Sequence, residues 1–258
     1  MSTLAQPVAA YMTSDLVLAR PGTPLIDVAS RLATRKISAV PVVDDDGAIV
    51  GVVSRYDLVH HRRLHPHADD VTCATIMTHA PVTLGVSDTV IDVARLMVAR
   101  RIHRVFVVDA GRLVGVVTTT DVTRAVEDAG VAPAIETIMS APVVTIRVDQ
   151  TLALAMEWLD RAHVTGLIVT DNDWPIGVFA QEDALAARDL APETVVGSLY
   201  DPSLICLPRD TPIHRAAAQC ARMGVRRIVV SHHHDFIGVV TGLDFAAAAA
   251  ATGAEVAA

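Results

Sequence analysis

Four aspartates recur at near-regular intervals, each closing the pattern Gly, two residues, usually a hydroxyl residue, two residues, Asp. They are Asp57, Asp121, Asp183 and Asp244, with 61 to 64 residues between neighbours. Each follows an apolar run and precedes a helical pattern, so the carboxylate stands where a strand leads into a helix. There it can accept hydrogen bonds from both hydroxyls of a ribose, and such charge-assisted bonds are short and strong. The preceding hydroxyl and the first helical N–H groups are within reach of a phosphate.

The same spacing has a second interpretation that needs no ligand. Ser or Thr followed three residues later by Asp, just before an apolar run, is a helix capping box. Ser54 with Asp57, Thr118 with Asp121, and Thr241 with Asp244 all satisfy it. The third copy has Ala180 in place of the hydroxyl, which predicts that Asp183 has lost its cap and its ligand. Spacing alone leaves both interpretations open.

Cationic residues precede the central strand in two of the four copies. His103 and Arg104 open "HRVFVVD", and Arg226 and Arg227 open "RRIVVSH", whereas the other two copies have Ser38 and Thr165 at this place. Arginine offers a planar fork for phosphate, and a nearby anion favours the charged form of histidine. A solvated basic strand end is the alternative.

The aspartates belong to four copies of one longer unit. Upstream of each lie a short strand signal, an amphipathic helix pattern, an apolar strand and a turn, and a further helix follows the acid. The unit is therefore β-α-β-β-α, about 60 residues long. A unit of this size buries too little apolar surface to be stable alone, so two units should pair. Gly130 and Pro133 interrupt the helical pattern and predict the boundary between the pairs.

This organisation resembles the CBS domain family, named for cystathionine β-synthase, over nearly the whole chain. The resemblance implies an α/β fold of four CBS repeats paired into two pseudo-two-fold Bateman modules. We expect module 1 at residues 1–130, with repeats at about 8–62 and 72–128. We expect module 2 at residues 131–258, with repeats at about 134–190 and 194–250. The modules could form a disk within one chain or with a second chain as a homodimer.

The resemblance also implies which residues share a cleft, because each family cleft draws on both repeats of a pair. In the family the Asp contacts ribose, a His-Arg pair contacts phosphate, and the sister repeat supplies residues around adenine. Module 1 would combine Asp121, Thr118, His103 and Arg104 with Thr13, Ile37 and Ser38. Its second cleft would hold Asp57, Ser54 and Thr78, and module 2 would combine Asp244, Thr241, Arg226 and Arg227 with Ser140, Val164 and Thr165. Near Asp183, Tyr200 stands where the corresponding Thr would be.

Composition and charge limit the class of protein. The chain has 258 residues, 52% of them apolar, and a net charge of −8, which argues against general nucleic-acid binding. The three cysteines form no disulfide or zinc pattern, which is typical of a reducing cytoplasm. We expect no membrane span, because no stretch of about 18 apolar residues occurs. The Ala-rich residues 245–258 predict a terminal helix that frays.

The sequence and the resemblance together predict a cytoplasmic regulatory protein that binds an adenosine-containing ligand and controls a partner protein of unknown identity. The ligand could be AMP, ADP, ATP, a cyclic dinucleotide or S-adenosylmethionine. A ligand-independent assembly module is the alternative. No nucleophile and base set can be assigned, so we expect no enzyme activity, no catalytic cofactor and no metal site.

Overall fold

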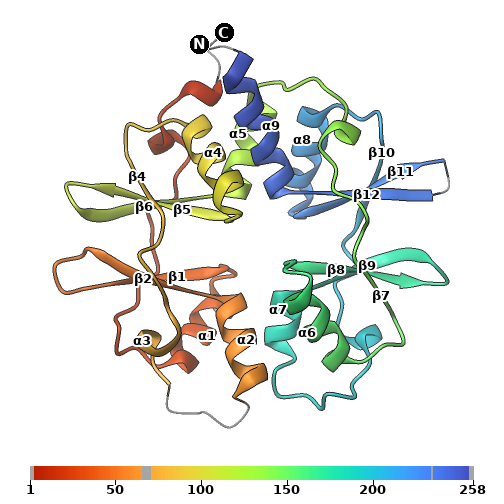
Figure 1. The fold of residues 1–258 in the computed structure, drawn as a ribbon, viewed down its shortest axis with the longest axis horizontal. Helices are drawn as coiled ribbons and strands as arrows, with labels where there is room; N and C mark the ends of the chain where they lie inside the picture. Colours follow the sequence, from red (N-terminus) through yellow and green to blue (C-terminus); the bar gives the residue numbers. More distant parts are fainter. Residues whose placement is uncertain (1–2, 66–70, 234, 256–258) are drawn as a thin grey trace. The chain divides into compact units, whose positions relative to one another are not determined.

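A computed structural model describes residues 3–65, 71–233 and 235–255 of the chain (Figure 1). Repeat 1 contains α1 (Leu25–Thr34), β1 (Ala39–Val43), β2 (Ile49–Ser54) and α2 (Arg55–Leu64). Repeat 2 contains α3 (Cys73–Ile76), β3 (Thr78–His79), β4 (Thr83–Gly85), α4 (Val90–Arg100), β5 (Arg104–Asp109), β6 (Arg112–Thr118) and α5 (Thr119–Asp128). Repeat 3 contains β7 (Thr145–Arg147), α6 (Leu152–Arg161), β8 (Gly166–Asp171), β9 (Trp174–Ala180) and α7 (Gln181–Ala186). Repeat 4 contains β10 (Ile205–Pro208), α8 (Ile213–Met223), β11 (Arg227–His232), β12 (Asp235–Thr241) and α9 (Gly242–Glu255).

The predicted β-α-β-β-α order is confirmed in repeats 2, 3 and 4. The strands β4, β7 and β10 run parallel to β5, β8 and β11, and each of these three forms an antiparallel hairpin with the strand that follows it, β6, β9 or β12. In repeat 2 the additional short strand β3 precedes this unit and pairs with β2. Single turns of 3-10 helix occur near the repeat starts: η1 (Thr3–Ala5) lies before repeat 1, and η2 (Val8–Ala10), η3 (Ile135–Thr137) and η4 (Val196–Ser198) open repeats 1, 3 and 4. In each repeat the last strand of the hairpin leads directly into the next helix, and the closing residues of the aspartate motif lie at this junction.

Repeat 1 differs, because its expected first strand is reduced to a single bridge between Ala19 and Val42. In repeat 2 the backbone N–H of Phe106 donates to the carbonyl of Val82 at 3.0 Å and extends the parallel ladder. Pro41 occupies the equivalent position in repeat 1, and proline has no N–H to donate. The missing donor explains why the ladder stops after one bridge.

The segment leading into each repeat, here called its leader, pairs with the hairpin of a neighbouring repeat. The N–H of Thr13 donates to the carbonyl of Val116 at 2.9 Å, and the N–H of Val116 donates back to Thr13 at 3.0 Å. Equivalent pairings join Thr78 to Val52, Ser140 to Val239 and Asp201 to Val178. The leaders are thus exchanged between repeats 1 and 2 and between repeats 3 and 4.

A glycine in each hairpin makes room for the leader that crosses it. A Cβ atom at Gly115 would lie 2.5 Å from the Sδ atom of Met12, closer than packed atoms can approach. The same relation holds for Gly51 and Met77 and for Gly238 and Met139, and Gly177 faces Tyr200. The Gly-Val signature of the repeats therefore marks a backbone crossing.

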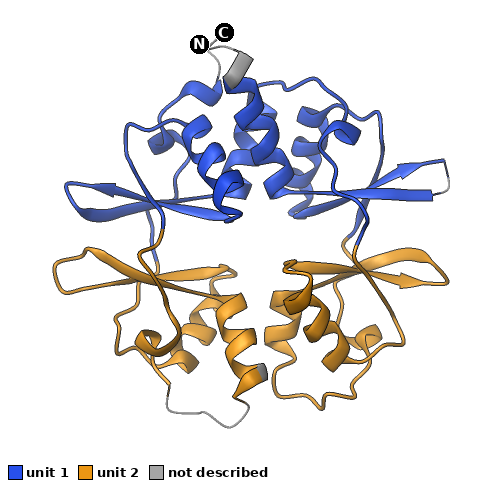
Figure 2. Ribbon diagram, viewed as in Figure 1, with its two compact units in different colours: residues 1–16, 82–143, 204–258 blue, residues 17–81, 144–203 orange. Residues whose placement is uncertain are grey.

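The chain divides into two compact units, coloured separately in Figure 2. Unit 1 comprises residues 1–16, 82–143 and 204–258, and unit 2 comprises residues 17–81 and 144–203. Unit 1 contains α4, α5, α8, α9 and the hairpins of repeats 2 and 4, and unit 2 contains α1, α2, α6, α7 and the hairpins of repeats 1 and 3, together with α3 and β3.

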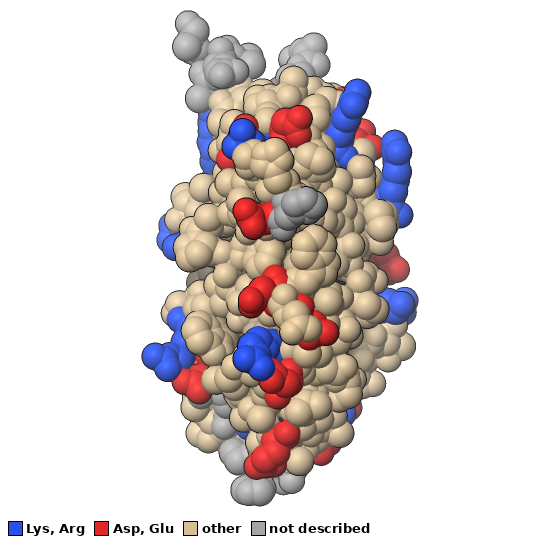
Figure 3. All heavy atoms as spheres, turned by 90° about the vertical axis from the view of Figure 1, so that its right-hand side faces the viewer, with Lys and Arg blue, Asp and Glu red and all other residues tan. Residues whose placement is uncertain are grey.

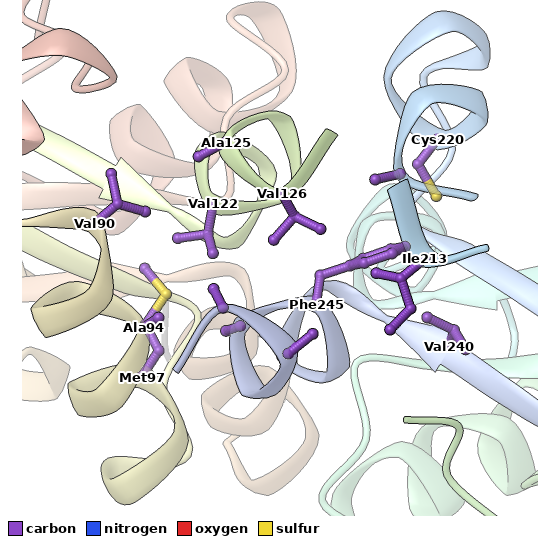
Figure 4. Close-up of a cluster of buried hydrophobic side chains, with 14 of the residues drawn as sticks. Val90, Ala94, Met97, Val122, Ala125, Val126, Ile213, Cys220, Val240 and Phe245 are labelled. Atoms are coloured by element: carbon purple, nitrogen blue, oxygen red, sulfur yellow. The ribbon is translucent and has the colours of Figure 1, made fainter. Parts of the chain in front are cut away.

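The core of unit 1 lies between helices of repeats 2 and 4 (Figure 4). Val122 and Val126 of α5 are fully buried, and Phe245 of α9 is 1% exposed. Helix α9 packs against α4 and α5, and α5 packs against α8. The predicted Ala-rich terminal helix is confirmed as α9, and Ala246 and Ala249 are fully buried in the core, where small side chains let helices approach closely. Fraying at its end stays a prediction, because residues 256–258 lie outside the described residues.

Unit 2 has its own apolar core, in which Leu32, Leu167 and Phe179 are fully buried. Helix α2 packs against α6 and α7 there. On the face shown in Figure 3, basic side chains stand apart from one another among acidic and uncharged ones. Of the helices that the structure describes, none is long and apolar enough to cross a membrane.

Candidate functional site

The aspartate motifs form capping boxes at the first turns of the helices that follow them. Both the backbone N–H and the hydroxyl of Thr118 donate to Asp121 Oδ2, at 2.8 Å each. Ser54 donates to Asp57 in the same way at 2.7 and 2.6 Å, as does Thr241 to Asp244 at 2.7 Å from both groups. The predicted boxes are confirmed, and in each box one carboxylate oxygen, Oδ2, accepts both bonds.

Asp183 keeps only part of this arrangement. The backbone N–H of Ala180 donates to Asp183 Oδ2 at 2.7 Å, and alanine offers no hydroxyl for a second bond. The hydroxyl part of the cap is thus lost in repeat 3, as the sequence predicted, while the backbone part remains.

The remaining oxygen of the acid differs between the two boxes of unit 1. Asp244 Oδ1 accepts a hydrogen bond from the hydroxyl of Ser140 at 2.9 Å. Asp121 Oδ1 lies 3.6 Å from Arg124, one turn along α5. Asp121 is buried, with 7% of its surface exposed, so a group that replaced one of these contacts would meet a largely desolvated carboxylate.

The leaders place three predicted residues beside the boxes. Thr13 pairs with the residue two before Thr118, Thr78 with the residue two before Ser54, and Ser140 with the residue two before Thr241. In the fourth copy, Asp201 occupies the pairing position and Tyr200 the position of the methionines that pack on the glycines. The sequence alignment of Tyr200 with the threonines was therefore wrong by one residue, because an aromatic ring replaces the methionine there.

The predicted cations of unit 1 lie at the strand starts that abut the boxes. Arg104 pairs with Thr118 across the β5–β6 hairpin, and Arg227 pairs with Thr241 across the β11–β12 hairpin. The carbonyl of His103 accepts a hydrogen bond at 3.1 Å from the first N–H of α5. Each cation pair therefore stands beside the box of its own repeat.

The structure also brings the two cation pairs together. Burial, with the positive charges of Arg104, Arg227 and Arg226, lowers the pKa of His103 to about 4. The sequence assigned Arg226 and Arg227 to a separate cleft. Arg226 and Arg227 approach His103 because the helices of repeats 2 and 4 pack together. No local sequence pattern predicts which repeats pack in this way.

The first turns of α5 and α9 meet at the same place. A Cβ atom at Gly242 would lie 2.5 Å from Thr119 Oγ1, so the side chain of Thr119 at the start of α5 packs directly on the backbone at the start of α9. The N-terminal end of a helix carries partial positive charge and exposed N–H groups. Two helix starts and the strand-start cations therefore give this part of unit 1 a positive potential.

Seven of the predicted ligand residues belong to unit 2: Ser54, Asp57 and Thr78 of the second cleft, and Ile37, Ser38, Val164 and Thr165, which were predicted to join boxes of unit 1. The carbonyls of Ser38 and Thr165 accept hydrogen bonds from the first N–H groups of α2 and α7, at 3.1 and 3.3 Å, as His103 does for α5. Ile37 and Val164 precede them and bond back to the end of the preceding helix. Their contribution to a cleft with residues of unit 1 stays a prediction. In the described part of the chain, no group of three or more His, Cys, Asp or Glu side chains is placed to hold a metal ion.

Comparison with known protein families agrees with the repeated fold. The model of the CBS domain matches residues 8–63, 73–128, 135–189 and 196–251. The fold defines a protein built of tandem α/β repeats. The chain belongs to the CBS domain family and contains four CBS domains.

Individual relatives cover parts of the chain. CBS domain-containing protein CBSX2, chloroplastic, from Arabidopsis thaliana is 30% identical over 145 residues, which is 45% of this chain and 61% of that protein. An uncharacterised 33.4 kDa protein in the ribosomal RNA operon of Thermofilum pendens is 29% identical over 175 residues, or 62% of this chain and 57% of that protein. The chain thus spans about 60% of the length of these two relatives.

Solved structures also match nearly the whole fold. The crystal structure of protein MJ1225 from Methanocaldococcus jannaschii aligns with a TM-score of 0.84 at 15% identity and covers 93% of this chain and 99% of that one. At this identity the likeness concerns the fold alone.

Proposed function

We propose that the protein is a ligand-sensing regulator that binds adenosine-containing ligands and relays their binding to a partner protein. The observation that carries this proposal is the position of the cations Arg104, Arg226 and Arg227, and of His103, beside the Asp121 and Asp244 boxes of unit 1. A carboxylate for a ribose and a positive region for phosphate are the two features that a nucleotide requires.

The geometry suggests how each part of a nucleotide would be held. The ribose hydroxyls would donate to Oδ1 of Asp121 or Asp244, since Oδ2 already serves the cap. The phosphates would lie toward the strand-start arginines and the first N–H groups of the helix. AMP, ADP, ATP, a cyclic dinucleotide and S-adenosylmethionine all share the adenosine part.

The relatives supply chemical support for this ligand class. CBSX2, which is 30% identical to the matched part of this chain, has a crystal structure in complex with AMP. In this chain, a ligand would act by favouring one arrangement of the repeats over another, and only by its difference in affinity for the two. The control of a partner protein, a location in the cytoplasm and a homodimer are further parts of the proposal.

The exchanged leaders support the assignment of residues 1–130 and 131–258 to two modules. Each leader pairs with the hairpin of the other repeat in its own half of the chain. We infer that repeats 1 and 2 form one module and repeats 3 and 4 the other.

A ligand-independent assembly module is the second candidate, and one observation favours it. The capping boxes are complete without any ligand, so the aspartates already have a structural role. The two functions differ in whether Asp121 also binds a ligand.

The substitution Asp121→Asn separates these functions, because the amide oxygen of asparagine can still accept the two hydrogen bonds from Thr118 but the side chain carries no charge. We expect near-wild-type stability without ligand and at least about tenfold weaker binding of AMP, ADP or ATP, a difference near 1.4 kcal/mol. Isothermal titration gives the affinity, and chemical unfolding gives the stability.

Asp183→Asn serves as the control, since repeat 3 lacks the hydroxyl, and it should change neither quantity much. Equal nucleotide affinity in wild type and Asp121→Asn would show that Asp121 is only a cap. A protein that purifies without nucleotide and binds none of the adenosine ligands would favour the assembly module.

A further inference from the structure

The end of α2 carries two histidines on one side of the helix. His61 and His65 are four residues apart, and the backbone N–H of His65 donates to the carbonyl of His61 at 2.8 Å, so helical hydrogen bonding extends to His65. Residues with this spacing are neighbours on a helix surface. The centroids of the two imidazole rings are 4.9 Å apart. The rings therefore lie side by side at the end of the helix.

The spacing of the two rings fits a shared metal ion. Zinc binds histidine nitrogen at about 2.0–2.1 Å in tetrahedral geometry, which places the centroids of two bound rings about 5 Å apart. Histidines four residues apart on a helix also supply two of the zinc ligands in the H-E-x-x-H motif. The observed ring spacing therefore matches that of a two-histidine chelate.

The contact between the rings has little of the geometry of direct stacking. Their planes are tilted by 41°, between the offset-stacked and edge-to-face arrangements that aromatic rings prefer. On the same helix, the rings of Tyr56 and His60 are stacked at an angle of 15°. Attraction between the rings therefore accounts less well for the approach of His61 to His65 than for that of Tyr56 to His60.

The surroundings of the pair suit a cation. His61 is half-buried and His65 is exposed, so an ion can reach both rings from solution. Burial, followed by the charges that His65 and His60 carry when protonated, lowers the pKa of His61, and a metal ion binds the neutral ring. The last carbonyls of a helix carry partial negative charge, which favours a cation at this end of α2. Arg62 lies 3.7 Å from Asp189, which offsets the positive charge of that arginine.

We propose that His61 and His65 bind a divalent transition-metal ion such as zinc, and that the ion fixes the last turn of α2. Two imidazoles fill two of the four tetrahedral positions, and water fills the others. The described residues contain no group of three or more such ligands, so among them these two side chains hold the ion. Because α2 packs against α6 and α7, the ion would stabilise the contact between repeats 1 and 3. The site belongs to unit 2 and does not depend on nucleotide binding at Asp121 or Asp244.

Zinc titration of the full chain tests the proposal. By isothermal titration, His61→Gln and His65→Gln should each weaken zinc binding at least about tenfold, because either change leaves a single ring where wild type has a chelate. Glutamine is a good helix former, so α2 should persist in both variants. Magnesium, which prefers oxygen ligands, should show no binding that depends on these histidines.

His232 and His233 form a matched control pair outside α2. Their ring centroids are 4.2 Å apart at the β11–β12 turn, and one is half-buried while the other is exposed, as in the α2 pair. The double variant His232→Gln, His233→Gln should bind zinc at the α2 pair as tightly as wild type.

Hydrogen exchange locates the ion on the helix. Saturating zinc should slow exchange of the backbone N–H groups in residues 55–65 of wild type and of the control variant, but not in His61→Gln or His65→Gln. If His61→Gln unfolds, His65→Gln at its exposed position gives the same comparison. The proposal is overturned by unchanged zinc affinity in either single variant, by a loss of affinity confined to the control variant, or by zinc that binds without slowing exchange in residues 55–65.

Discussion

His103 is the residue whose charge state depends most strongly on its surroundings. Burial, with Arg104, Arg227 and Arg226, holds its pKa at about 4 in the folded protein, against 6.5 for an ordinary histidine. Between these values the unfolded chain binds a proton that the folded protein does not. The free energy of unfolding therefore falls as pH drops through this window, and the stabilisation is fully present above it.

We expect wild type to lose on the order of 2 kcal/mol of stability from this residue between pH 7 and pH 4.5, after allowance for solvent screening. Urea unfolding at a series of pH values measures the loss. His103→Gln removes the titrating group and should flatten the curve, while His79→Gln, at an exposed position, should follow wild type. Parallel curves for wild type and His103→Gln would contradict this assignment.

At the scale of elements, the crossing of leader and hairpin depends on a glycine. Gly115→Ala places a methyl group against Met12, and such overpacking typically costs about 1–3 kcal/mol. A methyl group at Gly22 would have open space around it, with no packed atom within 4 Å, so Gly22→Ala should be nearly neutral. Thermal unfolding of the two variants compares them, and equal midpoints would show that the leader shifts without cost.

The elements themselves could be predicted from the sequence, but the exchange of leaders could not. Apolar periodicity and the fourfold motif predicted the repeat order, the boxes and the lost hydroxyl at Ala180. Pairing of Thr13 with Val116 joins residues about a hundred positions apart, and no local pattern encodes it. The approach of Arg226 and Arg227 to His103 likewise follows from helix packing between repeats 2 and 4. The helices of each repeat have an ordinary apolar face, and that face does not specify which helix it packs against.

At the scale of the whole molecule, unit 1 depends on a helix from the end of the described chain. Phe245 is 1% exposed in the core shared by repeats 2 and 4 (Figure 4). Phe245→Ala should destabilise the protein by about 3–5 kcal/mol, because it leaves a cavity as well as losing apolar contact. Hydrogen exchange should then rise in α4 and α5 as well as in α9.

Met223→Ala is the control for that substitution. Met223 is a large apolar side chain of α8 but is 61% exposed, so its loss should change stability by less than about 0.5 kcal/mol. A Phe245→Ala effect confined to α9 would show that repeats 2 and 4 are stabilised separately.

The three-segment composition of unit 1 has a consequence for how the chain is made on the ribosome. Its first segment ends at residue 16 and its last begins at residue 204. At about 5–20 residues per second, synthesis of the intervening chain takes on the order of ten seconds or more. During that time the apolar faces of α4 and α5 that pack against α9 remain uncovered. A nascent chain that has not yet reached Gly242 leaves these faces exposed to chaperones and proteases, so synthesis of α9 is the step that allows them to be buried.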